Sequence, residues 1–263
     1  MNKRDEPIKI RFGREFMKCP DLTLPGPATD REKRIPHPPL TKPVSGEVVS
    51  LGGFDGEIQA GDFAGLLSSR RSVRNFDSNA WLTRGQLAFL LWSAQGVDKV
   101  LGDDYLSLRT VPSGGARHPF EIYIAARNVD GLAGGLYRYL PFGSVGQRQA
   151  GVEYIGGLTG KTELAEMLAG QKWASNASVV MFFSCTPYRA EWRYGSRAHR
   201  VMLIDLGHAG QNVMLSACAL GLSSCCMAAF SQRHCDAVLG LDGESEYTVY
   251  AIAVGRECEN QSC

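Results

Sequence analysis

The chain has 263 residues, and its 28 lysines and arginines against 27 aspartates and glutamates give a net charge of +1. This balance excludes the basic surface of a general nucleic-acid or anionic-membrane binder. No apolar run approaches the roughly 18 residues of a membrane span, and the N-terminal residues lack the apolar region of a secretory signal. We therefore expect a globular enzyme in the cytoplasm, built as one large domain or two small ones, with no nucleic-acid or membrane partner.

The eight cysteines are scattered along the chain without any C-x-x-C spacing. A zinc site needs four convergent ligands, and the five histidines are too scattered to supply them. We expect no metal site, and we interpret the cysteines as free, buried thiols of a reducing compartment.

Residues 1–60 contain most of the 12 prolines and show no sustained hydrophobic period. Proline fixes the φ angle and lacks a backbone N–H donor, so a packed helix or a central strand is not expected here. The sequence predicts an extended, proline-rich arm over residues 1–60, a folded domain over 61–258 and a tail over 259–263.

The first predicted element of the folded domain is a helix over residues 82–96. Thr83 and Gln86 have the spacing of a capping box, and apolar residues follow at helical spacing. Two strands are then predicted, over 120–127 and 135–140, with a hairpin-type turn between them.

The second half of the chain alternates helices and strands. A short helix is predicted over 161–170, and the continuous β-branched and aromatic run of 177–186 predicts a buried strand. Residues 200–221 form the strongest helical pattern and are apolar around most of the circumference, which predicts a central, buried helix. A last strand is predicted over 247–255. This order predicts an α+β fold with a mixed, mainly antiparallel sheet flanked by helices.

Two stretches carry the candidate chemistry. Residues 66–76 place Arg70, Arg71 and Arg74 within five positions, with serines between them. Guanidinium groups bind phosphate oxygens bidentately and serine adds a donor, so the stretch fits a phosphate site, with a solvated face as the alternative. The loop 109–119 contains Gly114 and Gly115 and fits a backbone surface that lies flat against a planar ligand, or an ordinary tight turn.

Other common catalytic patterns are missing from the sequence. There is no G-x-G-x-x-G between an early strand and a helix, no Walker loop and no G-x-S-x-G elbow. Asp205 and His208 share a face of the long helix, and we interpret them as a hydrogen-bonded interior pair.

Six stretches in order and spacing resemble the nitroreductase superfamily, and more narrowly its SagB-type dehydrogenases, which are flavin oxidases associated with azoline-containing peptides. They are SSRRSVRNF, LLWSAQGV, VPSGGARHPFEIYIAA, GLYRYLP, the long stretch from RYGSRAHR to GLSSC, and VYAIAVGRE. The resemblance covers about residues 63–257. It implies a nitroreductase-like FMN fold with a long central helix, and a homodimer with two flavins at its interface.

The resemblance also implies a set of cofactor-binding residues. One group would hold the FMN phosphate and ribityl chain: Arg70, Arg71, Ser72, Arg74 and Arg256. A loop would lie against the flavin ring, presented by the partner subunit: Pro112, Ser113 and Gly114. The segment after the long helix, with Ala228 and Ala229, would line the flavin near its N5 atom.

Two positions depart from the family pattern. Arg193 and Tyr194 stand where azole-forming members have a Lys-Tyr pair, so Tyr194 is the expected proton relay, while Arg193 stays protonated and cannot act as a base. Arg117 and His118 replace apolar and aromatic residues, and they would either favour an anionic substrate or the phosphates of a nicotinamide cofactor, or face solvent.

The implied function is that of an FMN-dependent dehydrogenase acting on a peptide-derived or small heterocyclic substrate. Two alternatives stay open. The first is a reductase of nitroaromatics or quinones with NAD(P)H as co-substrate, and the second is a flavin-binding scaffold without turnover.

Overall fold

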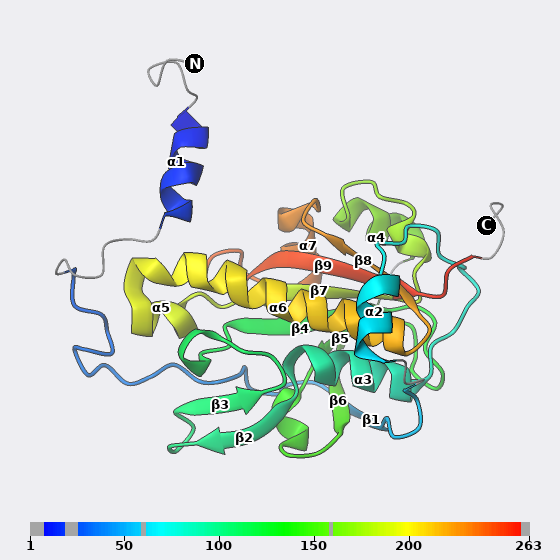
Figure 1. The fold of residues 1–263 in the computed structure, drawn as a ribbon, viewed down its shortest axis with the longest axis horizontal. Coiled ribbons are helices and arrows are strands. Elements are labelled where there is room, and N and C mark those ends of the chain that lie inside the picture. Colours follow the sequence, from blue (N-terminus) through cyan, green and yellow to red (C-terminus); the bar gives the residue numbers. More distant parts are fainter. Residues whose placement is uncertain (1–7, 19–25, 59–61, 158–159, 259–263) are drawn as a thin grey trace.

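An antiparallel sheet of seven strands forms the centre of the computed structural model, which describes residues 8–18, 26–58, 62–157 and 160–258 (Figure 1). The strand order is β1-β6-β5-β4-β7-β9-β8, and every neighbouring pair runs antiparallel. The strands of this sheet are β1 (Val48–Gly53), β4 (Phe120–Ala126), β5 (Gly135–Tyr139), β6 (Gln149–Gly156), β7 (Val179–Cys185), β8 (Ser223–Met227) and β9 (Tyr247–Gly255). A separate hairpin pairs β2 (Val97–Leu101) with β3 (Leu106–Arg109).

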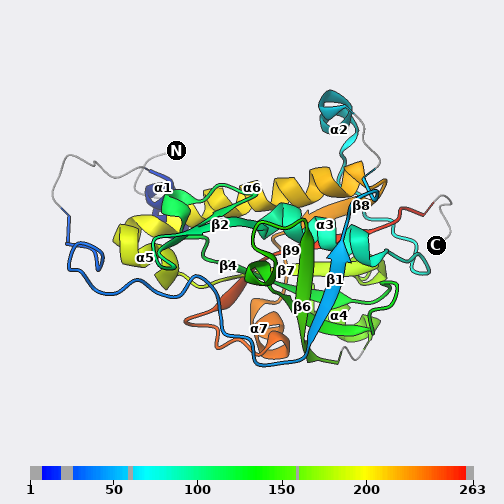
Figure 2. The ribbon, with the colours of Figure 1, turned by 90° about the horizontal axis from the view of Figure 1, so that it is seen from below.

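Helices cover both faces of this sheet, as Figure 2 shows. One face carries α3 (Arg84–Gln95) and α6 (Ala198–Ala219), and the other carries α4 (Lys161–Met167) and α7 (Gln232–Leu239). The central strand β7 is buried on both sides, since Met181 and Phe183 pack towards α6 while Val180 and Phe182 pack towards α4 and α7. The predicted α+β class and the antiparallel sheet are confirmed.

Three further helices and four 3-10 turns complete the described chain. The helices are α1 (Ile8–Met17), α2 (Phe63–Ser69) and α5 (Tyr188–Tyr194). The turns are η1 (Gly114–Ala116), η2 (Pro141–Ser144), η3 (Ala174–Asn176) and η4 (Gly195–Arg197). None of the described helices is long and apolar enough to cross a membrane.

The start of α3 is set by its own sequence. Thr83 accepts a hydrogen bond from Gln86 N, and the Gln86 side chain accepts one from Thr83 N, each at 3.0 Å. This reciprocal pair satisfies two of the N–H groups that a helix leaves without partners at its first turn. The predicted capping box is confirmed.

The long helix α6 has 22 residues, but its surroundings differ from the prediction. One stripe is buried, including Met202, Leu206 and Val213. Leu203 and Ile204 on the opposite side are 54% and 47% exposed. The prediction of a helix buried nearly all round is therefore wrong, because the described residues leave Leu203 and Ile204 about half exposed.

The segment predicted as an extended arm contains two elements that the sequence did not reveal. Helix α1 stands apart from the sheet in Figure 1. Strand β1 is an edge strand of the main sheet and pairs with β6, so the packed part of the chain begins before residue 61. The seven N-terminal residues of the arm, its residues 19–25 and the tail 259–263 lie outside the described residues.

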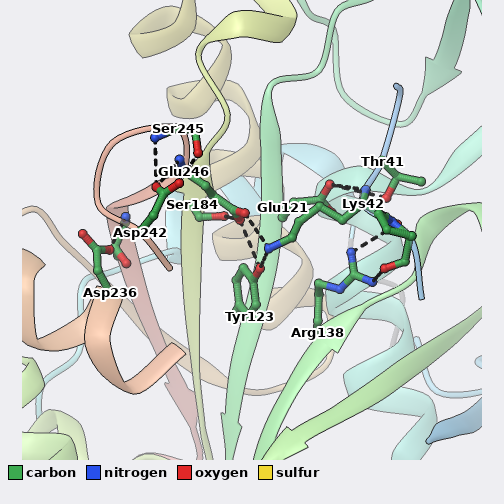
Figure 3. A network of polar contacts seen from close by, with 12 residues as sticks. Thr41, Lys42, Glu121, Tyr123, Arg138, Ser184, Asp236, Asp242, Ser245 and Glu246 are labelled. Atoms are coloured by element: carbon green, nitrogen blue, oxygen red, sulfur yellow. Dashed lines mark hydrogen bonds and ion pairs between the residues drawn. The ribbon is translucent and has the colours of Figure 1, made fainter. Parts of the chain in front are cut away.

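Two buried carboxylates, Glu153 and Glu121, hold this N-terminal segment on the sheet, and Figure 3 shows Glu121 beside Lys42. Glu153 pairs with Arg138 at 2.6 Å and accepts a hydrogen bond from Ser45 N at 2.6 Å. Glu121 accepts a hydrogen bond from Lys42 N at 3.3 Å. Buried charges are stable only when they are paired and hydrogen-bonded, so these carboxylates require the N-terminal segment to lie here.

The cysteines follow the prediction only in part. Five of the described ones are free: Cys185, Cys218, Cys225, Cys226 and Cys235. Cys258, however, is disulfide-bonded. The expectation of free thiols is wrong for this residue.

Candidate functional site

The arginine-rich stretch lies along the β8 edge of the sheet. Ser72 forms a parallel bridge with Ser224 of β8, and Val73 N donates to Ser224 O at 3.0 Å. Further along, Asp77 N donates to the carbonyl oxygen of Arg256 at 3.0 Å. These backbone contacts bring Arg256, which follows β9, to the stretch that contains the three other arginines.

The guanidinium groups of this cluster differ in their partners. Arg71 donates to the carbonyl oxygens of Ser68 and Arg70, at 2.9 and 2.7 Å. The Arg74 guanidinium lies 5.7 Å from the centre of the Trp173 ring. Within the described residues, Arg70, Arg74 and Arg256 have no carboxylate partner. These three arginines are therefore the candidates for binding an anion along this edge.

The segment after β8 lies on the same side of the sheet as Trp173. Ala228 and Ala229 are exposed, and the Ala229 carbonyl accepts a hydrogen bond from Gln171 Nε2 at 2.6 Å. Trp173 and Phe230 pack against the same hydrophobic cluster. Residues 171–173 thus contact both Arg74, through the Trp173 ring, and Ala229, through Gln171. The sequence patterns did not point to this segment.

The glycine-rich loop is held at the other end of α6. Asp205 accepts hydrogen bonds from Ser113 Oγ at 2.7 Å and from Gly114 N at 2.9 Å. Burial raises the pKa of Asp205, and these two hydrogen bonds and His208 oppose that rise. Pro112, just before the pair, is exposed.

The predicted interior pair of Asp205 and His208 is wrong. His208 is exposed, and the Asp205 carboxylate turns to Ser113 and Gly114 instead. Helical spacing places two residues on one face but does not determine which loop approaches that face. Asp205 therefore belongs with the candidate site residues, although the sequence pattern paired it with His208. The presence of an acidic residue in an otherwise apolar helix was the sequence feature that could have indicated this role.

Gly115 brings the loop against Arg193 and Tyr194. Its φ angle is +60°, and a Cβ atom here would lie 2.6 Å from both Arg193 Nε and Tyr194 Oη. Any larger residue would be strained by the backbone and would displace the two side chains. The structure therefore brings the predicted catalytic pair together with the predicted ring-binding loop.

Arg117 and His118, at the end of this loop, are both buried. The Arg117 guanidinium lies 5.4 and 5.2 Å from the ring centres of Tyr105 and Trp192, and its three nitrogens have no hydrogen-bond partner in the described part of the chain. Burial, with help from Arg109, lowers the pKa of His118 to about 2, so its ring is neutral. The alternative that these two residues face solvent is wrong.

The two groups of predicted site residues lie at opposite ends of α6. Asp205 holds the glycine-rich loop, whereas Cys218 contacts Ser69 beside the arginine stretch, with 3.2 Å between Sγ and Oγ. At 1.5 Å per residue, these two positions on the helix are about 20 Å apart.

Two relatives have similar sequences, and residues 67–256 match the nitroreductase family. MJ1384 of Methanocaldococcus jannaschii, which is named as a nitroreductase, is 34% identical over 194 residues, 74% of this chain and 90% of its own length. TfxB of Rhizobium leguminosarum bv. trifolii, named as a trifolitoxin-processing protein, is 29% identical over 150 residues. That match covers 56% of this chain and 39% of TfxB.

Solved structures share the fold. A structure from Anabaena variabilis, also named as a nitroreductase, has a TM-score of 0.64 and 26% identity, and the match covers 81% of this chain and 42% of that one. A chain of the Escherichia coli microcin synthetase McbBCD, in complex with truncated pro-MccB17, has a TM-score of 0.58 and 17% identity over 97% of this chain and 84% of its own. A structure from Exiguobacterium sibiricum in complex with FMN has a TM-score of 0.53 and 14% identity, and the match covers 76% of this chain and 90% of that one.

Proposed function

Because the chain belongs to the nitroreductase family, we propose that it is an FMN-dependent dehydrogenase of the SagB type. It moves a hydride between the flavin and a peptide-derived or small heterocyclic substrate. The observation that carries the proposal is the set of unpaired guanidiniums of Arg70, Arg74 and Arg256 on converging segments. The FMN complex of the Exiguobacterium protein supports the choice of cofactor.

The residues of the β8 edge fit a flavin mononucleotide. Arg70, Arg74 and Arg256 would neutralise its single phosphate, with the Ser72 hydroxyl as a further donor, because guanidinium forks match phosphate oxygens. Arg71 would contribute less, since its guanidinium already donates to two backbone carbonyls. Ala228 and Ala229 would present backbone groups to the ring. When bound, FMN supplies the hydride-accepting atom N5.

The second group of site residues would come from a second copy of the chain. The resemblance to the family implies that the partner subunit presents the Ser113 loop to the flavin. Helix α2 has no buried residue, and its Phe63 is 67% exposed. In Figure 2 it stands away from the sheet. A homodimer would cover this helix together with the exposed side of α6, and it would bring Pro112, Ser113 and Gly114 to the partner's flavin.

Tyr194 is the proposed proton relay. Its phenol lies at the Gly115 loop, next to the Arg193 guanidinium. Arg193 keeps its proton at any working pH, so its role would be to orient an anionic group and not to act as a base. TfxB is named as a trifolitoxin-processing protein, and the McbBCD complex is a microcin synthetase with truncated pro-MccB17 bound. Both support the choice of a peptide-derived substrate.

One observation favours a second candidate function. MJ1384, the relative with 34% identity, is named as a nitroreductase, so a reductase that uses NAD(P)H is the alternative. The purified protein should be yellow and release FMN on denaturation, and mass spectrometry identifies the flavin. Oxidation of an azoline-containing peptide without bleaching of the flavin by NAD(P)H would support the dehydrogenase. The reverse result would support the reductase, and a colourless protein that FMN does not reconstitute would refute both.

A further inference from the structure

Arg117 is the most deeply buried arginine in the described part of the chain. Its side chain is only 1% exposed, and none of the described salt bridges or hydrogen bonds reaches its three guanidinium nitrogens. Arginine keeps its proton at any working pH, so the fold encloses a full positive charge. A side chain enclosed in this way does not contact a substrate directly.

Two aromatic rings surround this charge in place of an acceptor. Tyr105 lies in the turn between β2 and β3 and Trp192 lies in α5, and their ring centres are 5.4 and 5.2 Å from the guanidinium. Cation–π contacts recover only part of what a charge loses when it leaves water. Arg117 therefore lowers the stability of the fold, and a methionine would fill the same space without a charge.

The charged groups around Arg117 are mostly positive as well. Arg189 is 3% exposed and pairs with the buried carboxylate of Glu121 at 2.6 Å. Arg109 is attracted by the same carboxylate and repelled by Arg189. Both Arg193 and Arg189 repel Arg117. Glu121 is thus shared by two other arginines, and the positive charge of Arg117 stays uncompensated.

His118 shows the effect of this excess charge on a neighbouring group. Its ring is 3% exposed, and burial lowers its pKa to about 2, with Arg109 and Arg117 adding to the fall. The interior next to the glycine-rich loop therefore disfavours a further positive charge. It favours a negative charge, because charges inside a protein are screened much less than in water.

We propose that the buried charge of Arg117 makes the flavin at the Ser113–Gly114 loop easier to reduce. Conversion of an azoline to an azole transfers a hydride to the flavin and a proton to the proposed relay Tyr194, and an acceptor such as dioxygen later removes the two electrons. The reduced ring therefore carries one more negative charge, which a nearby unscreened cation stabilises. The inference rests on the proposed function, and it explains why the flavin would accept a hydride from the substrate.

The reduction potential of the FMN-loaded protein tests the inference without turnover, by anaerobic titration with dithionite in the presence of a reference dye. Arg117→Met should lower the preference for reduced over oxidised FMN at least tenfold, which is about 30 mV for a two-electron couple. Arg117→Lys, which can keep a positive charge, should lose less. Arg233→Met on α7, at an exposed arginine, should change nothing. Urea unfolding of the FMN-free protein should show no loss of stability in Arg117→Met, because the variant removes an unpaired buried charge.

A wild-type potential in Arg117→Met would overturn the inference, and so would a loss of stability without a change in potential, because the guanidinium would then serve only to pack the two rings. Either result could occur in a protein that still oxidises azoline peptides, and the proposed function would then stand without it. A potential that depends on Arg117 in a protein without azoline activity would count against the proposed function and leave the role of Arg117 in place.

Discussion

The carboxylate of Asp205 accepts the hydroxyl hydrogen bond of Ser113 at 2.7 Å, across 92 positions of the sequence. Ser113 Oγ in turn accepts a hydrogen bond from His118 N at 3.0 Å. One buried residue of α6 thus fixes both ends of the glycine-rich loop. The long helix therefore holds the loop that is proposed to meet the flavin, in addition to the loop's own turn hydrogen bond from Ala116 N to Ser113 O.

Asp205→Ala should destabilise the fold by about 1.5–3 kcal/mol, the usual range for hydrogen bonds to a charged group. Ser113→Ala should cost less, because Gly114 N keeps its bond to the carboxylate. Urea unfolding of the FMN-free protein gives both values. Equal losses for the two variants would show that Asp205 acts only through Ser113.

Arg74→Ala should weaken FMN binding by roughly ten- to a hundredfold, which corresponds to about 1.5–3 kcal/mol for a charge-assisted contact. The apo protein should keep its stability, since Arg74 is exposed and has no carboxylate partner among the described residues. Flavin titration followed by fluorescence measures the affinity, with Arg233→Ala as the control. If Arg74→Ala bound FMN with wild-type affinity, the alternative that the arginine stretch is only a solvated surface would be correct.

Replacing the exposed apolar residues of α2 tests the dimer. Phe63→Asp combined with Leu67→Asp, at positions 67% and 49% exposed, should convert a dimer into monomers of 28.6 kDa and release the flavin. Burying two carboxylates without partners in an interface costs several kcal/mol. Light scattering during size-exclusion chromatography reports the mass. Val145→Asp, in an exposed apolar position between β5 and β6, is the matched control, and a wild-type that runs as a monomer would refute the arrangement.

Tyr194→Phe should lower the rate of azoline oxidation by about 10²–10⁴-fold, the usual size of a general acid–base contribution. FMN content and the flavin spectrum should stay unchanged, because the phenol is proposed to act on the substrate. Arg193→Lys should be tolerated, since it restores the family's Lys-Tyr pair. Stopped-flow reduction of the flavin by NAD(P)H is the second readout. An unaffected rate there, together with no azoline activity in the wild type, would favour the reductase.

Glu153 should make the fold sensitive to acid. Burial raises its pKa, but the hydrogen bonds from Ser45, Arg138 and Gly46 outweigh burial and lower the pKa from 4.5 to about 2. The unfolded chain therefore takes up this proton first as the pH falls. About 3 kcal/mol of stability, present above pH 4.5, should be lost progressively down to pH 2.

Urea unfolding between pH 7 and pH 2 checks this loss. Glu153→Gln should be less stable at pH 7, because it leaves the Arg138 charge buried without its partner, and its stability should fall less steeply below pH 4.5. Glu166→Gln on the exposed side of α4 should follow the wild-type profile. Parallel profiles for all three proteins would remove Glu153 as the source of acid sensitivity.

The sequence by itself determined the elements whose signals are local or periodic. The capping box at Thr83 acts over three residues, and the predicted strand over 247–255 coincides with β9 because continuous burial leaves an unbroken apolar run. The strand β7 could also be predicted from the sequence, because it is buried at every position and has a continuous run of β-branched and aromatic residues. The strands β1, β6 and β8 were not predicted, because their glycines, serines and cysteines match no simple hydrophobic period. Their pairing with neighbouring strands defines them.

Only the tertiary structure decided how the candidate site is assembled. The six sequence stretches that resemble the nitroreductase family identified the candidate residues. The partner of Asp205 and the burial of Arg117, however, depend on segments that approach from distant parts of the chain. The exposed side of α6 carries the same apolar pattern as its buried side, so its composition could not show which side the chain itself covers. The periodicity of side chains shows whether a surface is apolar or polar. Which segment covers that surface is determined by packing between parts of the chain that are far apart in sequence.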